Sequence, residues 1–542
     1  MTLRILALLL AVRVVSASNL ETIVKTDSGL VSGTGSGTAV RSYKGIPFAA
    51  PPVGDLRWKA PQPVKPWSGI RIANEYPKNC PQPPFVPGPQ SEDCLGLNVW
   101  TPARSASERL PVMVWIHGGG FVIGASSQSA YDGEPLASQG VVVVSLNYRL
   151  GVLGFLAHPG LSAESPNGVS GNYALLDMVA ALEWVKRNVS AFGGDQNNVT
   201  IFGESAGGSA VCLLMVVPQA QGLFQKVISE SAWGIYRPLS HLKNSWYARV
   251  PAERYGSTKL GPDIAALRAK SAADILKIVG LPDMTGESRG AERGETFLPV
   301  VDGLVLPDDP ARLFDAGKFH HVALIAGTNA DEGTLMGGPN VHNLEALKKY
   351  AAVTAGEQAD GMLTAYPAAS DAEAYSAATA AQGDLEFLLG TRGVLRAAAK
   401  YNPHTYQYQF TRVSGIGRRI KWGSYHASEI PYVFGTLPDS VYGTAAGFLG
   451  NFSVDGDTYN DQDAKLSKAM SAAWVQFAKT GDPNRPGVVR WPAFSSAKEA
   501  YLEFGDRIGA KESLHRRQLD FLERLESAMR EKGSTTTGGS QP

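Results

Sequence analysis

The chain has 542 residues and a formal net charge of zero, because 50 lysines and arginines balance 50 aspartates and glutamates. Its shares of hydrophobic residues (44%) and charged residues (18%) are those of an ordinary globular protein, which excludes wholesale disorder and fibrous architectures. A balanced charge gives no general attraction for nucleic acid or for an anionic membrane surface, so we expect neither as a partner.

The N-terminal segment has the features of a secretory signal peptide. Arg4 precedes an apolar run, and the stretch "VSA" that ends at Ala17 has the small-x-small arrangement that signal peptidases accept. We therefore expect residues 1–17 to direct export and the mature chain to begin near Ser18. Since no later window is apolar and long enough to span a bilayer, the mature protein is predicted to be soluble and secreted.

The region before residue 110 is rich in proline and glycine, which favours hairpins and loops at the edge of a sheet. Cys80 and Cys94 bound one of these loops. An oxidising compartment would favour a disulfide between them, which stabilises a fold by about 3 kcal/mol in the chain-entropy model. Cys212 lies in an apolar run and is predicted to be a buried free thiol. Sequons that offer glycan sites in a eukaryotic host are found at Asn188, Asn198 and Asn451.

From residue 111 onward, short apolar runs alternate with longer amphipathic ones. The short runs are rich in valine and isoleucine, which is typical of strands buried on both faces. Residues 173–189 place their apolar side chains on one face of a predicted helix. This alternation predicts an α/β fold with a mostly parallel sheet and right-handed crossovers. The apolar runs lie within residues 111–120, 141–150, 199–205, 226–231 and 321–329.

The later part of the chain predicts further helices and a tail. Residues 263–279 and 343–355 have alanine-based helical patterns, which we interpret as helical insertions that cover the sheet. Residues 532–542 lack large apolar side chains and are predicted to be disordered. Because no clear interdomain linker interrupts the chain, residues 18–531 are expected to form one domain.

A glycine-flanked serine stands where a β-branched run passes into a helical run. The pentapeptide from Gly203 to Gly207 has the G-x-S-x-G pattern in its strand, turn and helix context. Larger side chains two residues either way would collide in the strained turn that projects the serine Oγ. The alternative is a plain glycine-rich turn, but the helix N-terminus here favours a developing oxyanion. We therefore predict Ser205 to be a nucleophile.

The segment "WIHGGGF" supplies donors for such an oxyanion. Without Cβ atoms, Gly119 and Gly120 allow backbone N–H groups to approach a substrate carbonyl, and the N–H of Ala206 provides a third donor. An ordinary turn between a strand and a helix is the alternative. Three successive glycines after a buried strand favour the oxyanion hole.

The general base is expected to be one of nine histidines, because imidazole exchanges a proton near neutral pH. His117 adjoins the glycine loop and is interpreted as a scaffold residue. His426 lies in a loop downstream of the serine, where the chain order serine, acid, histidine places the base. Asp331 and Glu332 follow another apolar strand, and the residues alone do not choose between these two acids.

With these residues assembled, the chain resembles the type-B carboxylesterases, a family of α/β-hydrolases that includes the cholinesterases. The resemblance covers nearly all of the mature chain and is carried by "FGGDQNNVTIFGESAGG", "SEDCLGLNVW", "GIPFAAPPVGDLRW" and "SGNYALLDM". It implies an α/β-hydrolase fold, hydrolysis of a small-molecule ester through an acyl-enzyme, and no cofactor. No metal-ligand motif such as HExxH is present. The resemblance further implies Glu332 as the acid, His426 as the base, an oxyanion hole of Gly119, Gly120 and Ala206, a supporting serine at Ser231, and a disulfide between Cys80 and Cys94.

Two features narrow the predicted substrate. The first disulfide loop lacks the tryptophan that binds choline in cholinesterases, so choline esters are not the expected substrates. The segments "ESPNGVSGNYALLDM" and "GIGRRIKWGSYHASEIPYVF" are similar to those of fumonisin esterases, which release tricarballylate side chains. Arg418 and Arg419 match a polycarboxylate in bidentate geometry, although a solvated surface is the alternative for this pair. A catalytically inactive adhesion or binding protein on the same scaffold is the alternative function.

Overall fold

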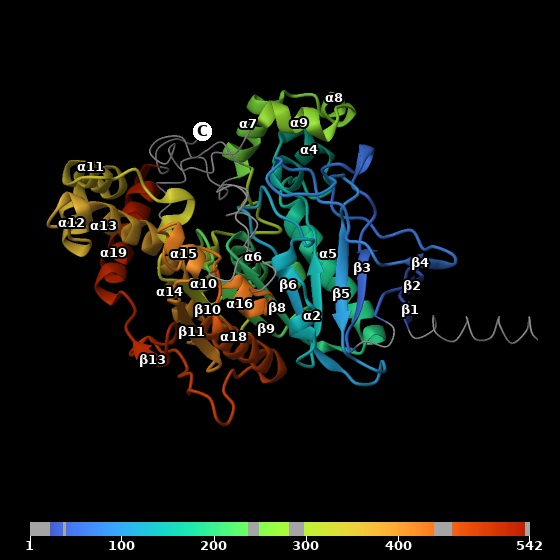
Figure 1. Cartoon of the computed structure of the whole chain (residues 1–542). Helices are drawn as coiled ribbons and strands as arrows, with labels where there is room; N and C mark the ends of the chain where they lie inside the picture. The colour runs from blue at the N-terminus through green and yellow to red at the C-terminus, as the bar shows by residue number, and fades with distance from the viewer. Residues whose placement is uncertain (1–21, 36–38, 237–248, 281–296, 438–457, 537–542) are drawn as a thin grey trace, which may run out of the picture.

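A ten-stranded mixed sheet forms the centre of the chain (Figure 1). The computed structural model describes residues 22–35, 39–236, 249–280, 297–437 and 458–536, so the expected signal segment, Ser18 and Asn451 lie outside the described residues. The strands, in spatial order, are β13 (Ile508–Glu512), β12 (Ala500–Phe504), β11 (Thr405–Phe410), β10 (Ala323–Asn329), β9 (Lys226–Glu230), β8 (Gly194–Glu204), β6 (Leu110–Ile116), β7 (Val142–Leu146), β5 (Gly96–Thr101) and β3 (Arg41–Pro47).

The strands from β12 to β7 run parallel to their neighbours, whereas β13, β5 and β3 pair antiparallel at the margins. The predicted mostly parallel sheet is therefore confirmed, and each predicted apolar run contributes one of its strands. The region before residue 110 supplies the marginal strands β3 and β5, as expected. It also forms a small separate sheet of β1 (Ile23–Lys25), β2 (Leu30–Ser32) and β4 (Ile70–Ile72).

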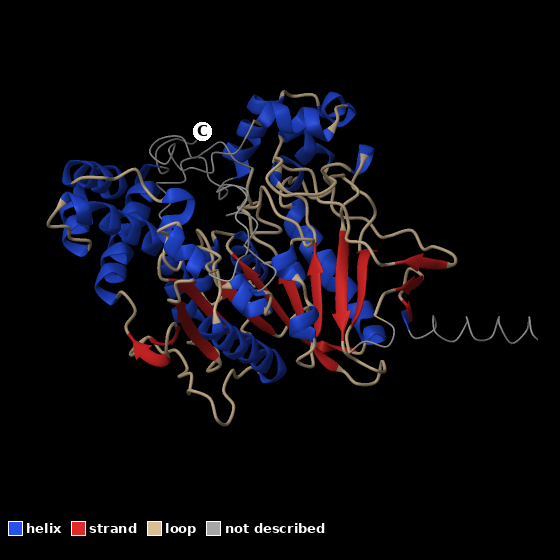
Figure 2. Cartoon of the chain, viewed as in Figure 1, coloured by secondary structure: helices blue, strands red, loops and turns tan. Residues whose placement is uncertain are grey.

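Apolar side chains on both faces of the sheet build two cores. Along β6, Val112 and Val114 belong to one core, and Met113 and Trp115 belong to the other. Helices therefore cover both faces (Figure 2), which is the three-layer solution for a parallel sheet. One core includes residues of α5 (Tyr173–Asn188), α6 (Ala206–Leu214), α10 (Pro310–Asp315) and α14 (Leu389–Ala398), and the other those of α2 (Glu134–Ala137), α16 (Ile430–Phe434) and α18 (Asp461–Thr480).

The predicted helical insertions form, and Ile264, Leu267 and Ile275 of the predicted segment 263–279 belong to the first core of the sheet. The predicted segment 343–355 and the two α-helices after it do not cover the sheet. These three helices share a separate apolar core with the C-terminal helix, beside the β13 margin (Figure 1). The helices of this cluster are α11 (Leu344–Ala355), α12 (Ala359–Ala365), α13 (Asp371–Gly383) and α19 (Arg516–Thr536). A second group consists of α3 (Gly151–Phe155), α4 (Pro159–Glu164), α7 (Arg249–Leu260), α8 (Ile264–Ala269) and α9 (Ala272–Val279).

Two expectations are corrected by the fold. Helix α19 continues to Thr536, so residues 532–536 of the predicted disordered tail are helical, whereas residues 537–542 lie outside the described residues. Asn188 is only 2% exposed, its side-chain oxygen accepts from the N–H of Asp27 (2.8 Å), and its amide donates to the carbonyl of Trp184 (3.1 Å). This sequon is therefore closed to a glycan in the folded chain. Within the described residues, no helix is long and apolar enough to cross a membrane.

Candidate active site

Ser205 lies in a tight turn between β8 and α6. Its backbone has φ 57° and ψ −122°, a conformation that residues with a side chain rarely adopt. A Cβ atom at Gly203 would come within 2.6 Å of the carbonyl oxygen of Ile116, and one at Gly207 within 2.0 Å of the same atom. These close approaches explain why glycine is needed at both positions, as the motif predicts.

His426 and Glu332 meet on loops beyond the sheet. Nδ1 of His426 lies 2.6 Å from Oε2 of Glu332. The other carboxylate oxygen, Oε1, accepts from the backbone N–H of Asn329 (2.7 Å) and from Oγ of Ser231 (2.5 Å). The neighbouring acid, Asp331, instead accepts from the backbone N–H of Ser424 (2.8 Å). The structure thus brings Glu332 rather than Asp331 to the imidazole.

The glycine loop after β6 lies against the serine turn. A Cβ atom at Gly118 would be 3.1 Å from Cβ of Ser205. Gly119 and Gly120 have φ values of 104° and 63°, and a Cβ atom on Gly119 would meet the carbonyl oxygen of Ile123 at 2.1 Å. A side chain does not fit at Gly119, so the backbone of this loop approaches the serine without an intervening side chain there.

His117 behaves as the scaffold residue that the sequence predicts. Its ring stacks on Tyr148 with 4.4 Å between centroids, and its Nδ1 lies 2.8 Å from the carbonyl oxygen of Gly118. Burial lowers the pKa of His117 to about 4, so the ring is neutral at physiological pH.

This arrangement can be compared with known proteins. The model of the carboxylesterase family matches residues 20–522. The chain belongs to the carboxylesterase family. It is 41% identical over 498 residues to the fumonisin B1 esterase of Sphingopyxis macrogoltabida, covering 90% of this chain and 87% of the relative. It is 37% identical over 487 residues to the para-nitrobenzyl esterase of Bacillus subtilis (strain 168), covering 87% and 92%. A solved structure of a PNB esterase superposes with a TM-score of 0.74 at 34% identity, covering 93% of this chain and all of that one.

The protein is therefore a carboxylesterase with an α/β-hydrolase fold, which hydrolyses esters. Family membership and the esterase relatives favour this enzyme over the catalytically inactive binding protein that the sequence left as an alternative. Within the described ranges, no group of three His, Cys, Asp or Glu side chains is arranged to hold a metal ion.

Three further buried glutamates lie in this part of the carboxylesterase, two of which act on His426, and the sequence reasoning missed all of them. Glu204, Glu230 and Glu429 are each 0% exposed. Oε1 of Glu204 lies 3.1 Å from Nε2 of His426, a close approach without the alignment of a hydrogen bond. Oε2 of Glu429 accepts from the side-chain amide of Asn329 (2.6 Å). The only signal in the sequence is an acidic residue at the end of each of two apolar strands.

Burial, followed by repulsion from neighbouring glutamates, raises the pKa of all three. Burial raises the pKa of Glu204 and Glu230 well above the usual range, and that of Glu429 to about 7. Burial by itself would lower the pKa of His426, but the carboxylates of Glu204 and Glu332 outweigh it and raise that pKa to about 9. The site therefore stabilises a positively charged imidazole.

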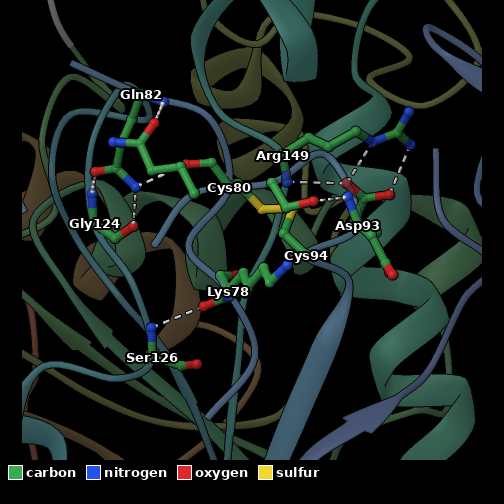
Figure 3. The surroundings of a disulfide bond; sticks show 12 residues. Lys78, Cys80, Gln82, Asp93, Cys94, Gly124, Ser126 and Arg149 are labelled. Atoms are coloured by element: carbon green, nitrogen blue, oxygen red, sulfur yellow. Dashed lines mark hydrogen bonds and ion pairs between the residues drawn. A yellow bond between two sulfur atoms is a disulfide. The ribbon is translucent and has the colours of Figure 1, made fainter. Parts of the chain in front are cut away.

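The predicted disulfide between Cys80 and Cys94 is confirmed, and its loop is tied to the glycine loop of the carboxylesterase. Figure 3 shows Gln82 beside Gly124: its Nε2 donates to the carbonyl of Gly124 (2.8 Å), and its Oε1 accepts from the N–H of that residue (2.8 Å). The free thiol of Cys212 is buried, as expected.

Arg418 and Arg419 end the short helix α15 (Gly415–Arg419), and both are exposed. The guanidinium of Arg418 donates to the carbonyl of Val413 (2.6 Å). Their common helix therefore places the two cations on the surface of the segment that leads into His426.

Proposed function

We propose that this carboxylesterase cleaves carboxylic esters with Ser205 as nucleophile, His426 as general base and Glu332 as the acid that orients the base. The observation that carries the proposal is the 2.6 Å contact between Nδ1 of His426 and Oε2 of Glu332, on loops of the same sheet that presents Ser205 in its strained turn. A carboxylate on Nδ1 fixes the ring tautomer and leaves Nε2 to exchange a proton.

The reaction follows from these roles. Nε2 of His426 takes the proton of Ser205 as Oγ forms a bond to the ester carbonyl carbon. The backbone N–H groups of Gly119, Gly120 and Ala206 donate to the oxyanion that results. When this intermediate collapses, the alkoxide leaves with the proton from His426 and an acyl-enzyme remains. Water then attacks with the same base, and the carboxylic acid and the free serine are released.

The first experiment compares wild type with Ser205→Ala on a short-chain p-nitrophenyl ester. Loss of the nucleophile is expected to lower kcat by roughly three to six orders of magnitude, since only oxyanion stabilisation and binding remain. Ser229→Ala is the matched control, because it removes another interior serine hydroxyl. In wild type the Oγ of Ser229 donates to the carbonyl of Gly208 (3.1 Å). Activity of Ser205→Ala within tenfold of wild type, with both proteins folded, would refute the assignment.

The acyl group of the natural substrate is proposed to be a polycarboxylate such as tricarballylate. Two observations support this: the 41% identity to a fumonisin B1 esterase, and the pair Arg418 and Arg419 near His426 in sequence. Guanidinium groups pair with carboxylates in bidentate geometry, and an exposed pair can receive an acyl group that extends from the serine.

The double variant Arg418→Ala/Arg419→Ala tests this substrate class. We expect KM for a tricarballylate monoester to rise about tenfold or more, because each charged hydrogen bond contributes about 1.5–3 kcal/mol. KM for the corresponding acetyl ester should stay unchanged. Lys421→Ala removes another exposed cation from the same segment and serves as control. Equal effects on the two esters would reject the role of the arginine pair.

We also infer that residues 1–17 direct export and that residues 18–531 form the hydrolase unit. The disulfide between Cys80 and Cys94 supports export, since such bonds persist in oxidising compartments. N-terminal sequencing of the mature protein should begin near Ser18. Accumulation of a chain that keeps Met1 in the cytoplasm would contradict this inference.

A further inference from the structure

Two of the buried glutamates stand side by side at the ends of neighbouring strands. β8 ends at Glu204, β9 ends at Glu230, and these two residues are register partners in the parallel pair. Partners on adjacent strands lie about 5 Å apart and direct their side chains to the same face of the sheet. Both residues are 0% exposed, and the charge of Glu204 contributes to raising the pKa of Glu230, so the two carboxyl groups interact inside the protein.

The hydrogen bonds of this pair are incomplete. Oε1 of Glu230 accepts from the indole N–H of Trp474 on α18 (2.7 Å), but Oε2 has no hydrogen-bond partner. Neither oxygen of Glu204 has an aligned hydrogen bond, although one lies 3.1 Å from Nε2 of His426. Buried carboxylate oxygens without partners are costly. A proton shared between the two carboxyl groups satisfies one oxygen on each side.

The charged groups around Glu204 and Glu230 also favour a proton bound to this pair. The other charged groups that act on it are Glu332 on the loop after β10, Glu429 before α16, and His426. Tyr408 on β11 adds a buried phenol whose pKa burial raises far above the usual range, so it stays neutral. One imidazole therefore stands against four buried carboxyl groups. Two carboxylates in one site cannot both ionise near neutral pH.

We propose that Glu230 is a positioning residue for the catalytic base: it keeps a proton that Oε2 donates to Glu204, so that the pair carries a single negative charge beside Nε2 of His426. This inference rests on the proposed role of His426. One charge stabilises the imidazolium that forms when His426 takes the serine proton. A second charge beside Nε2 would stabilise the imidazolium further and leave less of the neutral base before the reaction.

The test is the pH profile of kcat/KM for Glu230→Gln, Glu204→Gln and the double variant, each with its folded state checked. Glutamine at position 230 imitates the protonated acid, since its carbonyl accepts from Trp474 and its amide donates to Glu204. The pKa of the acid limb should therefore stay within about 0.3 of wild type.

In Glu204→Gln the freed Glu230 ionises farther from His426, so the acid limb moves moderately to lower pH. In the double variant the pair carries no charge, and the acid limb should move down by at least about one pH unit more than the sum of the single shifts.

Two outcomes would overturn the inference. Glu230→Gln alone could shift the acid limb as far as Glu204→Gln does, which would mean that Glu230 is ionised in wild type. The double variant could also show only the sum of the single shifts, which would mean that the two groups titrate independently. Either result would leave Ser205 as the nucleophile, and the Ser205→Ala experiment alone decides that assignment.

An infrared difference spectrum provides a readout that does not depend on activity. At pH 7, wild type minus Glu230→Gln should contain the carbonyl stretching band of a protonated carboxyl group. A carboxylate band in its place would refute the proposal. If Glu230→Gln does not fold, Trp474→Phe removes only the donor to Oε1, and the acid band is then expected to persist in that variant at pH 7. Its loss there would equally refute the proposal.

Discussion

The two carboxylate oxygens of Glu332 have separate partners. Oε2 contacts His426, while Oε1 accepts from Ser231 and from the backbone N–H of Asn329. A carboxylate held by donors on its second oxygen keeps a fixed direction, and this direction sets the tilt of the imidazole. Ser231, which is itself fully buried, therefore acts on the proposed base through Glu332.

We predict that Ser231→Ala lowers kcat roughly tenfold and leaves KM for a p-nitrophenyl ester nearly unchanged. The loss corresponds to one buried hydrogen bond of about 1.5 kcal/mol to a charged group. Ser229→Ala, on the strand that precedes Ser231, removes a buried hydroxyl that does not contact Glu332, and it should retain wild-type kcat. A kcat for Ser231→Ala equal to that of the control would show that Asn329 alone holds the carboxylate.

At this scale the sequence predicted the residues that carry a local pattern and missed those that depend on the sheet order. Ser205 and its glycines follow from the sterics of one turn. The choice between Asp331 and Glu332 needs the direction of each side chain. The carboxylate of Asp331 points to the backbone N–H of Ser424 and accepts a hydrogen bond from it. Glu204 and Glu230 are 26 residues apart, and only the adjacency of β8 and β9 brings them together.

At the scale of elements, the disulfide loop supports the glycine loop. Gln82 is 3% exposed and forms both of its Gly124 hydrogen bonds inside the protein. Gly124 has φ 122°, and a Cβ atom there would be 2.3 Å from Nδ1 of His117. The end of the glycine loop is thus fixed between a histidine scaffold and a side chain from the disulfide loop.

We predict that Gln82→Ala lowers kcat by about three- to tenfold, because the backbone donors of the glycine loop lose a fixed position. Thermal unfolding should also occur at a lower temperature, since two buried polar groups lose their partner. Gln62→Ala, an exposed glutamine in the same N-terminal region, is the control and should change neither quantity. Wild-type kcat in a destabilised Gln82→Ala would mean that the loop keeps its geometry without the disulfide loop.

The helical insertions show the limit of a helical pattern. Apolar periodicity predicts that a helix has a buried face, and α11 and α13 do have one. The pattern does not say which surface covers that face. Here the partner is α19, some 160 residues downstream of α11, so these helices form a separate core that meets the central sheet at its margin, through Tyr501 of β12.

At the scale of the whole molecule, the buried glutamates couple stability to pH. A group whose pKa is higher in the folded chain than in the unfolded chain contributes stability that is complete below its unfolded pKa. This contribution is lost as the pH rises through the folded pKa. For Glu429 the folded pKa is raised from 4.5 to about 7, chiefly by burial and by repulsion from Glu332. Its contribution therefore disappears between about pH 4.5 and pH 7.

We predict that Glu429→Gln raises the unfolding temperature relative to wild type at pH 8 but not at pH 4.5. A neutral glutamine avoids the cost of a buried charge, on the order of 3 kcal/mol for a shift of this size, while its carbonyl still accepts from Asn329. Measuring Tm of both proteins at the two pH values isolates this residue, since the titration of other groups is common to both. Glu345→Gln, at an exposed position on α11, should give the same difference from wild type at both pH values. Equal destabilisation of Glu429→Gln at pH 4.5 and at pH 8 would contradict this prediction. It would mean that the carboxyl group of Glu429 in wild type is ionised at both pH values, held by Asn329 and His426 against the repulsion of its neighbours.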